Sequence, residues 1–265
     1  MKKVLSVLLS LTLALSLCAC GGGSAPSAPA PEEVEVIVFA AASLTETLNQ
    51  IAEQYKSVAP QVKLTFTFDS SGTLQKQIEA GAECDLFLSA APKQMDALEE
   101  GGLIDDATRL DLLENKVTLA VPQGNPAGIE SYDQLAGLLK EGDVLLAMGN
   151  SDVPVGQYTL KIFDYYGIDE AAVADKLTYG SNVKEVTTQV GEGAVDCGII
   201  YATDAASAGL TVVDQATAEM CGQVIYPAAV LKASAHSEEA AAFLDYLKTE
   251  EAQAVFASVG FAPAF

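Results

Sequence analysis

Residues 34–46 read VEVIVFAAASLTE, and this stretch predicts a buried strand that leads directly into a helix. Residues 34–40 are rich in β-branched side chains, which favour strands. Ser43 is followed three residues later by Glu46, a capping box that predicts a helix start at Ser43. Apolar residues at helical spacing continue this helix to about residue 57. The stretch therefore predicts one β-α unit of an α/β fold.

Strands and helices alternate in the same way along the rest of the chain. Residues 62–68 (VKLTFTF) alternate as a strand does, and Ser70-Ser71-Gly72 begin a helix. A third strand at 84–90 precedes a helix that opens on Pro92. Successive β-α units indicate parallel sheets with helical crossovers, and the pattern restarts after residue 102, so we expect two α/β lobes. Further strands are predicted at 116–121, 144–148, 195–201 and 223–231, and further helices at 156–166, 182–190 and 237–248.

The composition excludes several classes of protein. The 265 residues include 14 Lys+Arg, 36 Asp+Glu and one His, which gives a formal net charge of −22. Hydrophobic residues make up 50 %, too many for a disordered acidic tail. So acidic a chain lacks the cationic surface that binds nucleic acid or anionic lipid. The single histidine, His236, excludes a His-rich zinc site. By the same reasoning, the charge argues against an anionic ligand.

The beginning of the chain has the features of a lipoprotein export signal. Two lysines precede an apolar run at 4–17, which is shorter than the roughly 20 residues of a membrane-spanning helix. The run ends in Leu-Cys-Ala-Cys at 17–20, which resembles a lipobox with Cys20 as the lipidated residue. We therefore expect a signal peptide at 1–19, a flexible tether at 20–33 and anchoring to the outer face of the cell membrane through Cys20. Ordinary signal cleavage beside an incidental cysteine is the alternative.

The cysteines beyond the tether do not predict a metal site. Cys84, Cys197 and Cys221 have spacings that match no zinc pattern. Cys84 and Cys197 lie in the apolar runs CDLFLSA and VDCGIIY, so we interpret both as small, buried strand residues.

Catalytic motifs are absent or incomplete. The sequence contains no Walker motif and no G-x-S-x-G elbow. Ser181 and Lys184 match the S-x-x-K of penicillin-recognising enzymes, but the K-T-G partner is missing. We therefore predict no catalysis. The alternative is a serine enzyme that uses Ser43, Ser71 or Ser181 with His236 as its one possible imidazole base.

Small or polar residues recur between predicted strand ends and helix starts. They occur at Ala42-Ser43, Ser70-Ser71-Gly72, Pro154-Val155-Gly156 and Ser181-Asn182-Val183. The first amides of a helix are unpaired and lie at the positive end of its dipole. Several such starts that converged at the carboxyl ends of parallel strands would bind an anion without any cationic side chain. Ordinary helix capping is the alternative for each one alone.

Several blocks, in a consistent order, resemble the periplasmic molybdate-binding protein (ModA) family. The first is VFAAASLT, and the resemblance extends from about residue 34 to the C-terminus. It implies a two-lobed type II periplasmic-binding-protein fold with a hinge and a ligand cleft between the lobes. Lobe one would comprise 34–119 and 224–265, and lobe two 120–223. The other blocks are SSGTL from 70, QIEAGA from 77, DLFLSA from 85, DVPVG from 152, GIIYATDA from 198, YPA from 226 and FLDYL from 243.

The resemblance also implies a set of ligand-binding residues. Ser43 and Ser71 match two serines that donate through hydroxyl and backbone N–H, and Tyr201 matches a tyrosine that donates its phenol O–H. Val155 and Val183 fall at helix starts that donate backbone N–H, although the family often has Ala where Val155 stands. The ligand would be molybdate or tungstate, with no cofactor and no metal beyond the oxyanion itself. The partners would be an ABC transporter permease and its ATPase subunit, and the binding protein itself would be a monomer.

These implied groups are all hydrogen-bond donors. Molybdate is fully deprotonated at neutral pH and offers only acceptors, as does sulfate, whereas phosphate carries a proton that wants an acceptor. Asp69 could supply that acceptor, but alternation from Phe68 and Ser70 predicts that it points away from the cleft. A binding protein for sulfate or phosphate, and an interaction lipoprotein with a vestigial cleft, stay as alternatives.

Overall fold

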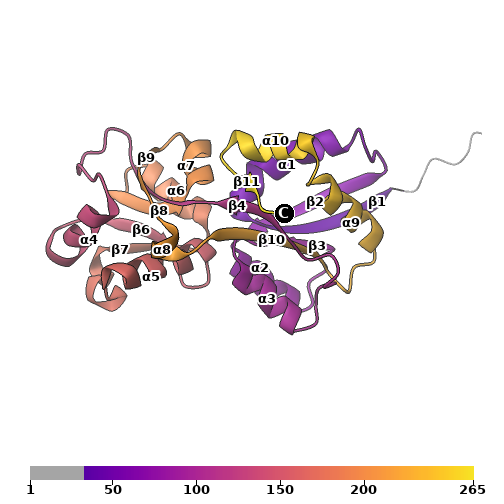
Figure 1. The fold of residues 1–265 in the computed structure, drawn as a ribbon, viewed down its shortest axis with the longest axis horizontal. Coiled ribbons are helices and arrows are strands. Elements are labelled where there is room, and N and C mark those ends of the chain that lie inside the picture. The colour runs from indigo at the N-terminus through magenta and orange to yellow at the C-terminus, as the bar shows by residue number, and fades with distance from the viewer. Residues whose placement is uncertain (1–32) are drawn as a thin grey trace, which may run out of the picture. The chain divides into compact units, whose positions relative to one another are not determined.

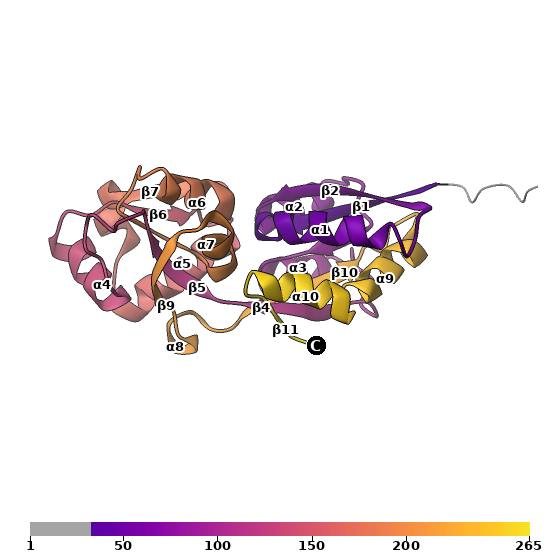
Figure 2. The same cartoon turned by 90° about the horizontal axis from the view of Figure 1, so that it is seen from above.

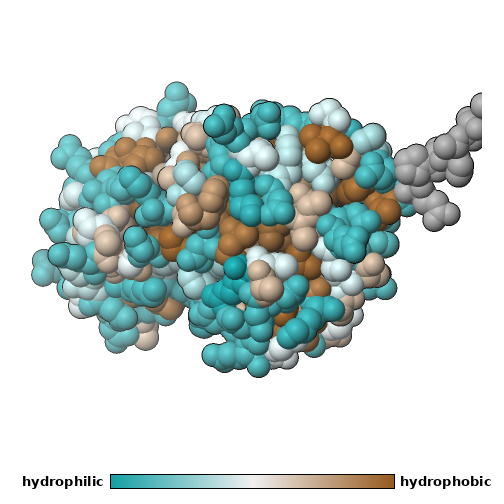
Figure 3. Space-filling model, turned by 45° about the vertical axis from the view of Figure 1, so that its right-hand side comes forward, coloured by the Kyte–Doolittle hydropathy of each residue, from teal (hydrophilic) through white to brown (hydrophobic). Residues whose placement is uncertain are grey.

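The computed structural model describes residues 33–265. The predicted signal peptide at 1–19, Cys20 and the tether up to residue 32 lie outside the described residues. Among residues 33–265, no helix combines the length and the apolar character needed to cross a membrane. Figure 3 shows one face of these residues, on which hydrophilic residues predominate and hydrophobic ones form small separate patches.

The first sheet is built from both ends of the described chain (Figure 1). It has six strands in the order β11-β4-β10-β3-β1-β2, and its parallel strands β1, β2 and β3 are each followed by a helix. We call this part lobe one. Its strands are β1 (Val34–Ala41), β2 (Val62–Asp69), β3 (Leu86–Leu88), β4 (Leu110–Asn115), β10 (Val224–Val230) and β11 (Ala262–Pro263). Its helices are η1 (Ala42–Leu44), α1 (Thr45–Tyr55), α2 (Ser71–Glu79), α3 (Pro92–Glu100), α9 (Ser237–Tyr246) and α10 (Glu250–Ser258).

The second sheet is continuous in sequence, and we call this part lobe two. It has five strands in the order β7-β6-β8-β5-β9, of which β6, β7 and β8 are parallel. Its strands are β5 (Val117–Val121), β6 (Leu146–Gly149), β7 (Leu177–Gly180), β8 (Cys197–Tyr201) and β9 (Thr211–Gln215). Its helices are α4 (Tyr132–Glu141), α5 (Pro154–Tyr166), η2 (Glu170–Lys176), α6 (Val183–Gly191), α7 (Ala202–Ala208) and α8 (Ala218–Cys221).

The chain passes between the sheets twice (Figure 2). Asn115 ends β4 in lobe one and Val117 already begins β5 in lobe two, so the expected boundary after residue 119 falls inside β5. The chain returns after α8, and β10 begins at Val224, where the return was expected. Both sheets are mixed, because β10 runs antiparallel to β3 and β4, and β5 antiparallel to β8 and β9.

The core includes the central strands of the second sheet. Strands β5, β6 and β8 are buried along their full length, as expected for apolar runs covered on both faces. The predicted two-lobed α/β fold is confirmed. Cys84, Cys197 and Cys221 are buried free thiols; Cys197 begins β8, whereas Cys84 precedes β3 by two residues.

Candidate functional site

A small cavity lies where six β-α connections meet, three from each lobe. Ser43, Ser71, Val155, Val183 and Tyr201, which the sequence singled out, all line it. They follow β1, β2, β6 and β7 or end β8, so the carboxyl ends of the parallel strands of both sheets face this point. The cavity volume is about 10 Å³, the scale of one water-sized sphere. Both lobes therefore enclose the site closely.

Ser43 does not cap a helix, and the capping-box prediction is wrong. It lies in the 3-10 turn η1, and α1 begins only at Thr45, without a side-chain cap. The Ser43 hydroxyl is instead 3.0 Å from the hydroxyl of Tyr226 on β10. A tertiary contact has prevailed here over a local motif, and it keeps the serine oxygen at the cavity.

Ser71 is the first residue of α2, and its neighbour Ser70 performs the capping. The Ser70 hydroxyl accepts a hydrogen bond from the Thr73 amide at 3.2 Å. The Ser71 hydroxyl oxygen accepts one from the Ala90 amide at 2.9 Å and is fully buried. Since an amide can only donate, Ser71 keeps its own proton to donate.

Lobe two supplies two helix starts. Val155 follows Pro154 at the first turn of α5, and Val183 is the first residue of α6, whose cap is Asn182. Amides in a first turn have no partner within their helix, and neither of these donates to another group within residues 33–265. Both valine side chains are buried, so only their amides are suited to a polar ligand.

Tyr201 ends β8 and is 1 % exposed. Its hydroxyl is buried and has no hydrogen-bond partner among residues 33–265. Burial raises the pKa of this phenol well above its usual value, so it stays a neutral donor. An unpaired buried hydroxyl costs about 1–3 kcal/mol, and at the wall of a cavity it is free to donate to a hydrogen-bond acceptor.

The lysine next to Val183 in sequence is already paired. Lys184, which follows Val183, lies 2.7 Å from Glu46 of α1 in lobe one and 3.2 Å from Asp204 of α7. Burial raises the pKa of Asp204 to about 6, and Lys184 opposes that rise. Lys184 thus joins the two lobes through Glu46, and its partners among residues 33–265 are carboxylates and not the Ser181 hydroxyl.

Asp69 turns toward the cavity, and the prediction that it points away is wrong. It lines the cavity, and its Oδ1 accepts from the Ser70 amide at 2.7 Å and from Asn182 of lobe two at 3.4 Å. Asp69 is the last residue of β2, where the chain leaves the sheet and strand alternation no longer fixes the direction of a side chain.

The lobes touch beside the cavity. A Cβ on Gly72 of α2 would lie 2.1 Å from the backbone oxygen of Asp152 in lobe two, so only glycine fits there. Lys76 on the next turn of α2 lies 2.7 Å from the Asp152 carboxylate. Together with the Lys184–Glu46 pair, these contacts join the two lobes beside the cavity.

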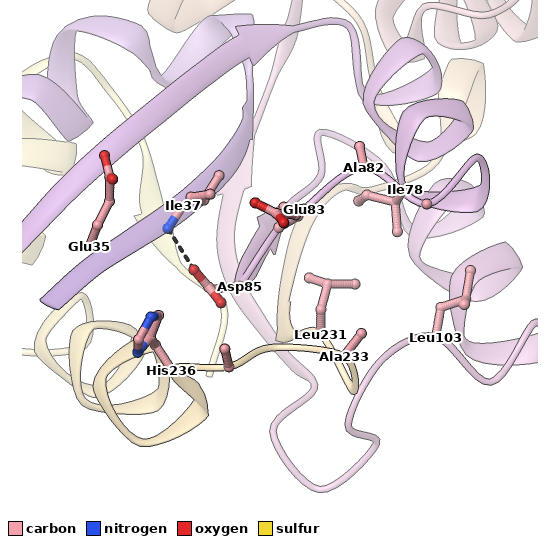
Figure 4. A pocket seen from close by; sticks show the side chains of 13 residues that line it. Glu35, Ile37, Ile78, Ala82, Glu83, Asp85, Leu103, Leu231, Ala233 and His236 are labelled. Atoms are coloured by element: carbon pink, nitrogen blue, oxygen red, sulfur yellow. Dashed lines mark hydrogen bonds between the residues drawn. The ribbon is translucent and has the colours of Figure 1, made fainter.

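His236 lies in a different place. It lines a second cavity of about 450 Å³ in lobe one, together with Glu35 and Ile37 near the start of β1 (Figure 4). Ser43 follows the other end of this strand and lines the other cavity, whose lining residues do not include His236. We call the first cavity, lined by Ser43, Ser71, Val155, Val183 and Tyr201, the donor cavity. The imidazole that a serine enzyme would need is therefore not at the donor cavity.

The donor cavity suits a ligand that accepts hydrogen bonds. Its contributions from the predicted residues are hydroxyls and amides, and the one arginine of the sequence, Arg109, pairs with Asp96 and Glu99 instead. No cluster of His, Cys, Asp or Glu within residues 33–265 could hold a metal ion. The arrangement can therefore bind an anion without a formal positive charge.

The chain is similar to known solute-binding proteins. The family described as bacterial extracellular solute-binding protein matches residues 36–262. YvgL of Bacillus subtilis, provisionally named an ABC transporter substrate-binding lipoprotein, is 34 % identical over 84 % of this chain and 85 % of its own length. The molybdate-binding protein ModA of Escherichia coli is 36 % identical over 84 % of this chain and 87 % of its own length.

Solved structures agree on the fold. The periplasmic molybdate-binding protein of Azotobacter vinelandii superposes with a TM-score of 0.76 and 20 % identity, over 87 % of this chain and 100 % of that one. At this identity the likeness concerns the fold alone.

Proposed function

Because the chain belongs to the family of bacterial extracellular solute-binding proteins, we propose that it captures molybdate or tungstate outside the cytoplasm and delivers the ion to an ABC transporter. The unpaired Tyr201 hydroxyl carries the proposal, since it shares one cavity with Ser43, Ser71 and the Val155 and Val183 amides. These donors match a tetrahedral anion that offers only acceptors. The protein binds and releases its ligand without catalysis or a cofactor.

Delivery would follow closure of the lobes. With the ion bound, contacts such as Lys184–Glu46 and Lys76–Asp152 stabilise the closed form, and that form docks on the permease, whose ATPase subunit drives transport.

The binding protein acts as a monomer, held at the outer face of the membrane by a lipid on Cys20. Cys20→Ala should abolish incorporation of radiolabelled palmitate and release the protein from the membrane fraction. Retention of label in this variant would contradict the anchor.

Calorimetric titration tests the ligand. Molybdate, tungstate, sulfate and phosphate are titrated at pH 7.5 into a chain that lacks residues 1–31 and keeps every described residue. We expect submicromolar affinity for molybdate or tungstate and no response to sulfate or phosphate. Tight phosphate binding with no molybdate response would overturn the proposal.

A second candidate, phosphate, rests on Asp69. Its carboxylate lies at the cavity and could accept the proton of hydrogen phosphate. Asp69→Asn separates the two ligands. If phosphate is the ligand, the variant loses affinity because the acceptor is gone, whereas molybdate binding should be unchanged or tighter once a nearby negative charge is removed.

A further inference from the structure

The Ser43 hydroxyl ends a buried chain of hydrogen bonds that begins where the polypeptide crosses between the lobes. Asn115, the last residue of β4, donates from Nδ2 to the Tyr226 hydroxyl at 3.1 Å. The Tyr226 hydroxyl lies 3.0 Å from Ser43 Oγ. Asn115, Tyr226 and Ser43 are 2 %, 1 % and 5 % exposed, so water does not compete for these bonds.

The orientation of Asn115 fixes the direction of the first hydrogen bond. Asn115 Oδ1 accepts a hydrogen bond from the Lys116 amide at 2.8 Å, which places the Nδ2 donor toward Tyr226. Nδ2 also donates to Thr203 of lobe two at 2.9 Å. The Tyr226 oxygen therefore accepts from Asn115, and the Tyr226 hydroxyl can donate its own proton to Ser43 Oγ. With Tyr226 as the donor, Ser43 accepts this proton and keeps its own hydroxyl proton for the cavity.

The Ser71 hydroxyl is also left free to donate, but a single backbone amide orients it. Its oxygen accepts directly from the Ala90 amide, a donor whose direction cannot change. Ser43 depends instead on two side chains that mutation can alter. Of the two serines, Ser43 is thus the one whose hydrogen-bond direction can be tested by mutation.

We propose that Tyr226 and Asn115 are positioning residues that determine specificity, because they hold Ser43 in its donor orientation. This inference rests on the proposed oxyanion site. A serine held as a donor favours an oxyanion without protons, and it disfavours one whose O–H needs an acceptor. Neither residue is among those that line the cavity, so both would act through Ser43.

The test is a double-mutant cycle by calorimetric titration of molybdate. Tyr226→Phe should weaken molybdate binding about fivefold to tenfold, because Ser43 loses the bond that orients it. In a Ser43→Ala background, the same change should have no further effect. Phosphate, measured by competition with molybdate, should lose less affinity, so the ratio of the two affinities falls. Tyr158→Phe is the matched control. Its side chain is also buried, and among residues 33–265 its hydroxyl bonds only to the Gln223 carbonyl, at 3.5 Å. The change should leave both affinities unchanged.

Asn115→Asp is a second variant, and it should reverse the direction of the hydrogen bonds between residue 115, Tyr226 and Ser43. The new carboxylate accepts the Tyr226 proton, so Ser43 must donate to Tyr226 and no longer to the ligand. We expect a loss of more than tenfold when Ser43 is present. The same change made in the Ser43→Ala background measures the effect of the added charge alone, and the difference between the two backgrounds removes it.

Two outcomes would overturn the inference while the proposed function stands. One is wild-type molybdate binding that Tyr226→Phe leaves unchanged. The other is an equal loss with Ser43 and with alanine at that position. A folded wild type that binds no molybdate overturns the proposed function itself, and the inference with it.

Discussion

The two lobes bring donors to one cavity by different chemical means. Lobe one offers the hydroxyls of Ser43 and Ser71, whereas lobe two offers the amides of Val155 and Val183 together with the Tyr201 hydroxyl. An amide donates whatever its side chain is, and a helix start fixes its direction. A serine hydroxyl can either donate or accept, so lobe one needs further groups to set its polarity. Lobe two should therefore tolerate side-chain changes that lobe one does not.

The two lobes can contribute donors to one cavity only when they are in contact. Gly72→Ala should prevent this contact. The added Cβ would lie 2.1 Å from the Asp152 carbonyl, so the closed form is lost along with the donors of lobe two. We expect molybdate affinity to fall about a hundredfold or more. Gly137→Ala, in a helix with open space around it, is the control and should leave binding unchanged. Equal affinities in the two variants would contradict closure at Gly72.

Removing one amide of lobe two should have the next largest effect. Val183 is the first residue of α6 and follows Asn182 in an extended conformation, a position at which proline is well tolerated. Val183→Pro should lose about 1.5–3 kcal/mol of binding free energy, because a hydrogen bond to a charged ligand disappears. Val183→Ala keeps the amide and serves as control. A proline variant that folds and binds normally would remove this amide from the site.

On the side of lobe one, deletion of a hydroxyl should have a similar or smaller effect. Ser71→Ala and Ser43→Ala should each weaken molybdate binding by about 1–3 kcal/mol, since each loses one donor. Calorimetry on the two variants measures this loss. If both retained the wild-type affinity, the hydroxyls of lobe one would not be ligand donors.

Asp204, buried in lobe two, should affect stability more than affinity. Burial raises its pKa from 3.8 to about 6, so the folded state binds more protons than the unfolded state between these values. Its contribution to stability therefore falls as pH rises from about 4 to about 6, and is constant above that range. Relative to wild type, Asp204→Asn should melt at increasingly higher temperature over the same range. A difference in melting temperature that does not change with pH would contradict this.

The smallest effect should come from a side chain of lobe two whose amide remains. Val155→Ala shortens a buried side chain at the cavity but leaves its N–H in place. We expect molybdate affinity within threefold of wild type, roughly 0.7 kcal/mol. A larger change would mean that side-chain volume, and not only the amide, shapes this half of the site.

Elements with strong local patterns could be predicted from the sequence. The apolar runs of β1, β5 and β8 fix these strands to within two residues, because buried strands have few alternatives. Strand β4 was missed: its sequence LDLLEN carries two acidic residues, and its pairing with β10 and β11 is formed by residues more than a hundred positions away. Helices α4 and α10 were also missed.

The sequence likewise predicts one part of the candidate site and not the other. The resemblance to a family identified five residues, but their meeting in one cavity depends on tertiary structure, which no local pattern contains. The sequence predicts a capping box at Ser43, and this prediction is wrong because the Ser43 hydroxyl contacts Tyr226 instead. Tyr226 itself had one signal in the sequence: a buried tyrosine in a strand needs a partner for its hydroxyl.

The discontinuous first sheet has a consequence for the order of folding. Strand β10 lies between β3 and β4, so until residues 224–230 are synthesised this sheet exists only as two separate pieces. The second sheet needs nothing beyond residue 215 and can form earlier, from contacts that are closer in sequence. During export, the part of the protein that begins the chain is thus the last to be completed, and β1 to β3 expose apolar surface until the C-terminus arrives.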